Sequence, residues 1–514
     1  MIILWGLLTS LAVIILFGLN LYLFYGLDFS LLSSNLVGLE VGINQGDYLC
    51  FSMLFFCGFI SLLFSLHYFG WIESWLNFLI LGFLSVMLNL IASEDVILGL
   101  FWWEYLGVVS FFLILYYGNF DTLFAGNTTI VASRGGDVGF FLLICYCIGG
   151  LNLGLLGVIC ILLIVLTKSA VIPFCSWLLE AMRAPTPVSC LVHSSTLVAA
   201  GVWFVASYGE FLFSDLVSTI LLVCCLTTIM LSGIVALVFC DIKKIVALST
   251  CNNISWCLVY YLLSSPILCL CQLVCHGVGK CMLFIAIGDS LSSAGGSQNK
   301  SCFSLVPANS LLGLIGVSLL SISVAGFPFL GVFFTKHAML NGVFYNSSLL
   351  LISLMFCCIF ISYAYSLRLV FLVCSPFGVN NQWLNNTYYF LSSLVLLCSV
   401  FGYFFGMGLE ELTIVSFWGS FGILCANMIG VFVGYYFYIT PSNELFWSSF
   451  GFNDDSVSGV LKDFSLFSVI NSILFNFRGE VSIANFLSSF SVTSLVRLTS
   501  IPLFSLLVLI TTVM

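Results

Sequence analysis

Charged side chains are scarce in this chain. Only 6% of its 514 residues are Asp, Glu, Lys or Arg, whereas a soluble domain carries roughly 25%. This scarcity excludes a water-soluble globular protein. Basic residues are the rarer kind, with 12 Lys and Arg against 21 Asp and Glu, so the chain has no basic groove that could neutralise the phosphates of a nucleic acid. Nucleic acid is therefore excluded as a partner.

Motifs that bind cofactors are also missing. The sequence has no dinucleotide-binding fingerprint and no four cysteines spaced to hold an iron–sulfur cluster. The run Gly277-Val278-Gly279-Lys280 imitates the end of a phosphate-binding loop, but Val274 and Cys281 stand where that loop needs Gly and Ser or Thr. The 22 cysteines lie mostly inside apolar runs, where cysteine packs as a small hydrophobic residue. We therefore expect that this chain itself holds no cofactor and no metal.

Apolar residues are abundant and make up 61% of the chain. The apolar runs are continuous, whereas the strands of a membrane barrel alternate apolar and polar residues. We therefore predict an all-α, polytopic membrane protein. Because a crossing needs about 20 apolar residues, we expect about fifteen transmembrane helices, near residues 4–25, 50–69, 74–93, 96–117, 135–150, 153–173, 186–207, 215–239, 242–263, 265–288, 308–333, 348–375, 386–407, 417–438 and 496–514.

Two apolar stretches are predicted to be broken helices. Residues 308–340 are too long for one crossing and are interrupted at Gly326-Phe327-Pro328. Residues 153–180 contain Lys168 followed by Pro173, and proline removes a backbone donor. Interrupted backbone at membrane depth is tolerated only where protein or a water-filled cavity covers it, and broken helices in two halves of a chain indicate a transport site. A kink that serves packing alone is the alternative.

Charged residues outside these spans fall on two sides. One side is acidic and holds Asp28, Glu40, Asp47, Glu94, Asp95, Glu210, Asp215, Glu410 and Glu411. The other side is basic and holds or borders Arg134, Arg183, Lys243, Lys244, Lys300, Lys462, Arg478 and Arg497. The positive-inside rule makes the basic side the inner one. Residues 439–495 belong to that side, and their middle has one apolar face, as expected of a helix that lies along the membrane surface.

Six ionisable residues lie within the predicted spans or, for Lys336, within the long apolar stretch 308–340, and each charge in such a setting costs about 2.5–3.5 kcal/mol. They are Glu104, Lys168, His193, His276, Lys280 and Lys336. Burial favours the neutral amine and a nearby carboxylate favours the charged one, while histidine titrates near physiological pH. These are the components of a proton relay, although any one of them alone could be a structural ion pair. For Asp137, Asp241, Lys243, Lys244 and Arg368, near span ends or in less certain spans, a solvated role and a functional one both stay open.

Several short motifs follow one another in a fixed order: Trp103-Glu104, Arg134-Gly135-Gly136-Asp137, Thr167-Lys168-Ser169-Ala170, Pro185-Thr186-Pro187-Val188-Ser189, His193-Ser194-Ser195-Thr196, Asp241-Ile242-Lys243-Lys244, His276 with Lys280-Cys281-Met282, and Ala325-Gly326-Phe327-Pro328-Phe329. This ordered set resembles that of the antiporter-like membrane subunits of respiratory complex I. The resemblance covers roughly residues 45–440. Each motif alone is weak, whereas the ordered set is specific.

The resemblance implies two inverted half-channel repeats, each with a broken helix. The domains expected from it are 1–73, N-terminal helices; 74–240, the first repeat; 241–407, the second repeat; 408–438, an additional helix; 439–495, a lateral amphipathic segment; and 496–514, a C-terminal anchor. A lysine at the second broken helix and a C-terminal extension past a core of fourteen helices are features of one branch of the family. Lys336 and residues 439–514 resemble these features. Only one predicted span precedes residue 45, where the family has two.

The resemblance also implies roles for single residues. Glu104 and Lys168 would be the coupled pair of the first half-channel, with His193 as the next relay residue. His276 and Lys280 would form the central relay, and Lys336 would be the exit-side residue of the second half-channel. Asp137 and His337 are further candidates. The chain departs from the family pattern at Cys175, Leu179, Arg183 and His337.

The implied function is that of a translocase subunit in NADH:ubiquinone oxidoreductase, which moves protons while partner subunits hold NADH, FMN, iron–sulfur clusters and ubiquinone. The implied partners are other complex I membrane subunits, among them the other antiporter-like chains, and membrane lipid such as cardiolipin. The implied location is the mitochondrial inner membrane, with a bacterial plasma membrane as the alternative. Two other functions stay open: a subunit of a multi-subunit cation/proton antiporter, and a structural scaffold with decayed channels.

Overall fold

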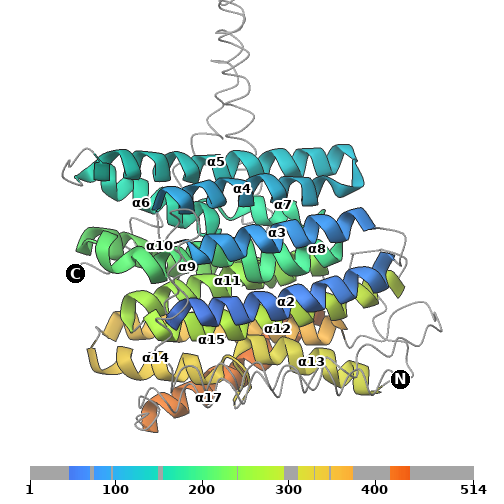
Figure 1. The fold of residues 1–514 in the computed structure, drawn as a ribbon. Helices are drawn as coiled ribbons and strands as arrows, with labels where there is room; N and C mark the ends of the chain where they lie inside the picture. Colours follow the sequence, from blue (N-terminus) through green and yellow to red (C-terminus); the bar gives the residue numbers. More distant parts are fainter. Residues whose placement is uncertain are drawn as a thin grey trace, which may run out of the picture.

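The computed structural model describes residues 45–69, 74–93, 96–148, 154–239, 241–264, 266–293, 311–328, 330–346, 349–373 and 417–439. Within these ranges every regular element is helical (Figure 1). The helices are α2 (Gln45–Phe69), α3 (Ser74–Ala92), α4 (Val96–Ile114), α5 (Phe120–Ile148), α6 (Leu155–Lys168), α7 (Ser176–Ala181), α8 (Thr186–Leu191), α9 (Leu197–Leu212), α10 (Asp215–Ala236), α11 (Ile242–Leu263), α12 (Pro266–Ser293), α13 (Leu311–Ala325), α14 (Phe333–Asn346), α15 (Leu349–Val373) and α17 (Phe417–Ile439).

Ten of the described helical segments are long and apolar enough to cross a membrane, judged by length and composition. The predicted all-α, polytopic membrane class is thereby confirmed. Both predicted helix breaks are present as well, because α6 ends at Lys168 before α7, and α13 ends at Ala325 before α14. The expected spans 4–25, 386–407 and 496–514 lie outside the described residues, as does the segment 439–495 apart from its first residue, Ile439.

The predicted start of the span 135–150 is wrong. Helix α5 begins fifteen residues earlier, at Phe120, and runs through Arg134 and Asp137 without a break. The same helix corrects the placement of Arg134, which was expected to border a loop. Arg134 lies within the helix with its side chain partly exposed, and it is ion-paired with Glu104 of α4. A paired charge is far less costly in an apolar environment than an isolated one.

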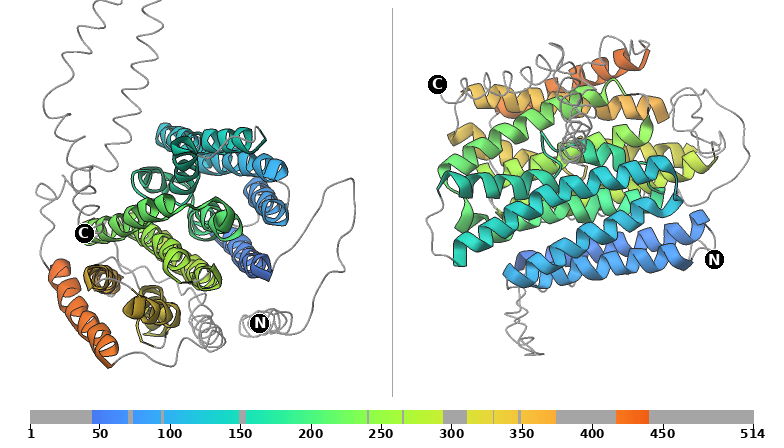
Figure 2. Two further views of the ribbon diagram at one scale, coloured as in Figure 1. Left: turned by 90° about the vertical axis from the view of Figure 1, so that its left-hand side faces the viewer. Right: turned by 90° about the horizontal axis from the view of Figure 1, so that it is seen from above.

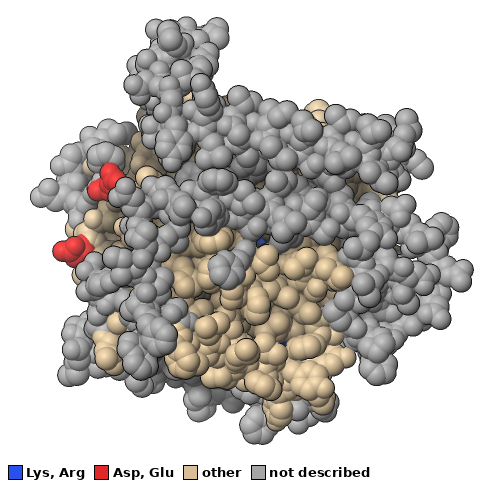
Figure 3. Space-filling model, turned by 90° about the horizontal axis from the view of Figure 1, so that it is seen from below, with Lys and Arg blue, Asp and Glu red and all other residues tan. Residues whose placement is uncertain are grey.

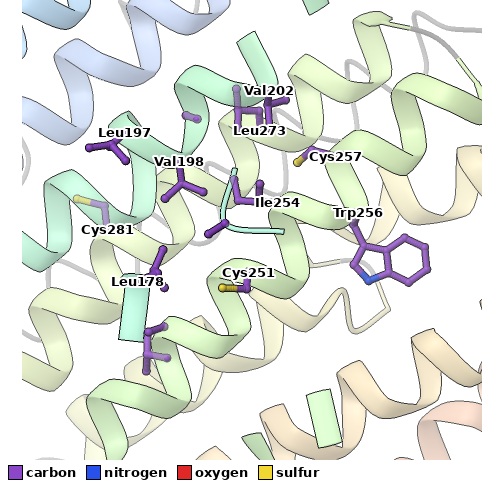
Figure 4. Packing of buried hydrophobic residues seen from close by; sticks show 14 of the residues in the cluster. Leu178, Leu197, Val198, Val202, Cys251, Ile254, Trp256, Cys257, Leu273 and Cys281 are labelled. Carbon is purple, nitrogen blue, oxygen red and sulfur yellow. The ribbon is translucent and has the colours of Figure 1, made fainter. Parts of the chain in front are cut away.

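The helices are stacked side by side, and α11 and α12 lie in the middle of the stack (Figures 1 and 2). Helix α12 contacts α2, α8, α9, α11, α13 and α14. Its neighbour α11 contacts α9, α10, α14 and α15. Figure 4 shows Ile254, Leu273 and Val202 among the apolar side chains that fill this centre. Charged side chains on α12 are therefore enclosed by protein on most sides.

The outer helices turn apolar side chains outward. Phe78 of α3, Phe101 of α4 and Phe432 of α17 are largely exposed. The face in Figure 3 agrees, since acidic residues appear only at one edge of its described part and Lys and Arg hardly contribute to it. A lipid environment is the solvent that suits such a surface.

Candidate functional site

The first helix break places a lysine at the end of a buried half-helix. Lys168 is the last residue of α6, and its side chain is only 1% exposed. The chain then passes through Ala170, whose φ of 53° lies in the left-handed region that residues with a Cβ rarely adopt. Trp177 of α7 donates from Nε1 to the Thr167 carbonyl at 2.9 Å and so ties the second half-helix to the first. A cation at a helix C-terminus is also favoured by the helix dipole.

Four side chains of alternating charge lie in a row that ends at this lysine. Lys168 Nζ lies 3.7 Å from Asp137 Oδ1, and Asp137 Oδ2 lies 3.5 Å from Arg134 Nη1. Arg134 is in turn ion-paired with Glu104. Asp137 is buried at 4% side-chain exposure, whereas Arg134 is 45% exposed. The expected pair of Glu104 and Lys168 is thus bridged in the structure by Arg134 and Asp137, and Asp137 is the carboxylate that lies closest to the lysine.

Small residues let α5 and α6 approach closely enough for these contacts. A Cβ added to Gly139 would lie 2.8 Å from the Cys160 carbonyl oxygen of α6. A Cβ added to Gly136 would overlap the side chain of Thr167 of α6, whereas one added to Gly135 would meet nothing within 4 Å. The Gly-Gly-Asp sequence of α5 therefore presents Asp137 to Lys168 at a tight helix crossing.

His193 lies in a π turn, Val192–Thr196, that joins α8 to α9. Such turns are frequent at functional sites because they re-aim side chains within a helix. The ring is fully buried, and neither nitrogen has a hydrogen-bond partner among the described residues. His193 and Lys168 line one cavity together with Ser133, Thr167 and Trp177, which has room for at most about one water molecule. Water in this cavity would connect the imidazole with the amine.

Lys280 and His276 lie four residues apart on α12, as predicted, and both are fully buried. Lys280 Nζ donates to the Val246 carbonyl of α11 at 3.2 Å and to the Ser249 hydroxyl. Neither nitrogen of His276 has a hydrogen-bond partner among the described residues. Burial without partners is costly for an imidazole, which is a reason to expect water or a transient partner at this position.

The second helix break supplies acceptors for Lys336. Between α13 and α14 the backbone passes through Gly326 and Gly331, whose φ values of 84° and 47° are in the left-handed region. Carbonyl groups at the end of α13 lack helical partners. Ala325 accepts from Lys336 Nζ at 2.5 Å, and Gly326 accepts from the Tyr363 hydroxyl at 2.7 Å. The break thus creates the polar pocket in which the amine lies.

The remaining contacts of Lys336 are polar or aromatic. Ser362 Oγ accepts at 3.3 Å, and the rings of Trp256 and Tyr363 each lie 5.7 Å away. Among the described residues no carboxylate forms an ion pair with this lysine. His337 does not join the pocket by any contact that we find in the described part of the chain; its ring packs instead on Phe333 with centroids 4.2 Å apart.

The other residues for which two roles were open are placed differently. Arg368 of α15 is buried and donates to the Ala236 carbonyl at 2.7 Å and the Val238 carbonyl at 3.5 Å, so it caps the end of α10. Asp241 precedes α11, Lys243 is buried near the start of that helix, and Lys244 lies over the Phe239 ring. The two hydrogen bonds from Arg368 to the end of α10 favour a structural role for this arginine.

Sequence reasoning missed a buried carboxylate, Asp289 of α12. The predicted span ended at residue 288, one position before it, whereas α12 continues to Ser293. Asp289 Oδ1 lies 3.2 Å from His67 Nε2 at the end of α2. The available signal was an acid within an apolar run together with a histidine at the end of another span.

Three comparisons place these residues among known proteins. The sequence profile of the family described as NADH:quinone oxidoreductase/Mrp antiporter, transmembrane, matches residues 93–362. Curated proteins called NADH-ubiquinone oxidoreductase chain 5 are similar: that of Lumbricus terrestris is 33% identical over 59% of this chain and 54% of its own length. That of Locusta migratoria is 31% identical over 80% and 73%, respectively. The chain thus spans about half of the length of the earthworm relative.

Solved structures share the fold. The chain is similar to one in the Mrp complex from Dietzia sp., with a TM-score of 0.69, 19% identity and coverage of 98% of this chain and 60% of that one. A chain of respiratory complex I from Thermus thermophilus with bound NADH gives a TM-score of 0.64 and 19% identity over 81% of this chain and 93% of that one. At this level of identity the comparison concerns architecture alone.

Proposed function

The chain belongs to the transmembrane family shared by NADH:quinone oxidoreductases and Mrp antiporters, and on this basis we propose that it is a proton-translocating membrane subunit of an NADH:ubiquinone oxidoreductase. It would correspond to chain 5, the name of its curated relatives. NADH, FMN, iron–sulfur clusters and ubiquinone would be bound by partner subunits, and this chain would move protons in response to redox chemistry in those subunits.

The observation that carries the proposal is a succession of buried amines and imidazoles across the bundle. Lys168, His193, His276, Lys280 and Lys336 are each no more than 3% exposed. The elements that hold them are neighbours: α6 contacts α9, the π turn contacts α9 and α12, and α12 contacts α14. Structural stability alone does not call for five such residues in an apolar interior, because each is costly to bury.

The two helix breaks support a division into two half-channels, 74–240 and 241–407. In each, a lysine lies next to interrupted backbone, Lys168 before the first break and Lys336 after the second. Residues 1–73 would precede these units, and 408–438, 439–495 and 496–514 would follow as an additional helix, a lateral segment and an anchor. The animal relatives support a location in the mitochondrial inner membrane, where other antiporter-like chains and lipid such as cardiolipin would be neighbours.

A subunit of a cation/proton antiporter is the second candidate, because the matching family and the Dietzia complex include Mrp antiporters. Inside-out vesicles that contain the native assembly distinguish the two. We expect NADH to drive proton uptake into the vesicles, and we expect a sodium gradient without NADH to drive none. Proton exchange driven by sodium, with no response to NADH, would support the antiporter and contradict the proposal.

A further inference from the structure

A second titratable pair lies outside the succession of amines, at the end where α2 and α12 finish. His67 is in the last turn of α2, and its side chain is 45% exposed. Asp289 is near the end of α12, and its side chain is 3% exposed. His67 Nε2 donates to Asp289 Oδ1 over 3.2 Å. One member of the pair can therefore reach bulk water while the other is enclosed.

This end of the bundle belongs to the inner side. The chain leaves α12 toward Lys300, and α11, which contacts α12, begins beside Lys243 and Lys244. Basic residues mark the inner side by the positive-inside rule. The exposed edge of His67 therefore faces the compartment from which a proton pump must take its protons.

Other titratable side chains of the described residues lie near the pair, among them Tyr116 against Phe69 and Tyr117 beside Tyr68. Tyr68 follows His67 in α2 and packs on Phe64 and Phe69. From the neighbouring helices, α3 contributes no acidic, basic or thiol side chain, and α8 contributes only Cys190, a buried thiol. His67 is an ion-pair partner of Asp289, so a change in the protonation of His67 changes the charge beside that carboxylate.

The choice of histidine matters for what the pair can do. A buried carboxylate needs a compensating charge, and Lys or Arg would supply it permanently. Histidine supplies it only when protonated, and it gains and loses that proton near physiological pH. A His–Asp pair at an aqueous edge therefore changes its charge with every proton that it takes up, which a fixed ion pair does not.

The contacts also indicate where a proton would go next. Asp289 meets α2, whereas Lys280 of the same helix meets α11, so the pair does not face Lys280 directly. The Thr186 hydroxyl of α8 is buried without a hydrogen-bond partner among the described residues, and it would lie 3.1 Å from a Cβ on Gly288. His193 lies seven residues after Thr186 in the same helical segment, which corresponds to about 10 Å along the helix axis.

We propose that His67 and Asp289 form a proton-uptake pair that takes protons from the inner aqueous side toward His193; this rests on the proposed function. The imidazole accepts a proton from water at Nδ1 and becomes imidazolium. It then gives its Nε2 proton to the Asp289 carboxylate, which becomes a neutral acid, and the imidazole is left neutral with its proton on Nδ1. Passage of that proton inward restores the carboxylate, and a flip of the ring then turns the protonated nitrogen toward Asp289 and the unprotonated one toward water for the next proton.

The test uses inside-out vesicles of the intact assembly, in which the inner side faces the medium. His67→Ala and Asp289→Asn are each expected to lower the initial rate of NADH-driven proton pumping at least about tenfold, since positioned proton carriers commonly contribute more than this. Imidazole added to the medium should restore pumping by His67→Ala but not by Asp289→Asn. Tyr68→Phe, which keeps the aromatic ring of the neighbouring residue, is the matched control and should pump normally.

Two results would overturn the inference. One is normal pumping by both variants. The other is a loss in His67→Ala that imidazole does not restore although immunoblots show the chain assembled, because the residue would then act through structure only. Lys280→Met separates this from the proposed function: if that variant stops pumping while the His67 and Asp289 variants pump normally, only the uptake pair is rejected.

Discussion

Replacement of Lys336 by Ala is expected to lower NADH-driven proton pumping about 100-fold or more. The amine lies in the pocket made by the second helix break, where it donates to Ala325 and Ser362. Without it the break holds acceptor groups and no proton carrier. Because the described residues place no carboxylate beside this lysine, its charge is held mainly by carbonyl, hydroxyl and aromatic groups, which permits the neutral form as well.

The Lys336→Arg variant tests whether the proton must leave. Guanidinium keeps its proton under all physiological conditions, so this variant is expected to fail as Lys336→Ala does. Both would be measured as initial pumping rates in vesicles containing equal amounts of assembled chain. Normal pumping by Lys336→Arg would show that a positive charge is sufficient, and the role of Lys336 as a proton carrier would have to be abandoned.

The second large effect is expected at the pair of Asp137 and Lys168. Asp137→Asn leaves Lys168 without its nearest anion, and Lys168→Met leaves Asp137 without its buried cation. Removal of one member of a buried ion pair typically costs about 3–5 kcal/mol. Because each single variant also removes a positioned proton-exchanging group, it should pump at least about 100-fold more slowly, and the double variant should be little worse than either, because residues that act as a unit are not additive.

The same helix offers a matched control for this pair. Asp121 of α5 also accepts an ion pair, from Arg183 at 3.1 Å, but its side chain is 77% exposed. Ion pairs in water contribute little, so Asp121→Asn should pump as the unchanged protein does. Additive losses in the Asp137/Lys168 double variant, or an equal loss in Asp121→Asn, would contradict the coupling of Asp137 to Lys168.

The sequence predicted the helix breaks and the buried amines for clear physical reasons. Gly326 and Pro328 in a run too long for one crossing required interrupted backbone, and the structure has the break there. Lysines inside apolar runs had to be enclosed by protein or water, and Lys168, Lys280 and Lys336 are buried. Such inferences depend only on residues close together in the chain.

Contacts between helices were less predictable, because sequence periodicity does not give the register of one helix against another. The pairing of Arg134 with Glu104, and of Asp137 with Lys168, follows from the close crossing of α5 with its neighbours. The predicted start of α5 was too late because Arg134, which is ion-paired with Glu104 of another helix, lies within α5 and not at its edge. Asp289 was missed because its partner His67 is 222 residues away in the sequence.

The central claim is that protons pass through buried amines of this chain, and Lys280 is where it can be tested most directly. This lysine lies in the middle of the bundle on α12 and donates only to Val246 and Ser249 among the contacts found for its amine in the described residues. The measurement is the number of protons pumped per NADH oxidised, compared between the unchanged assembly and Lys280→Met. The account predicts a lower ratio in the variant, with the chain still assembled. An unchanged ratio at an unchanged rate of NADH oxidation would contradict it.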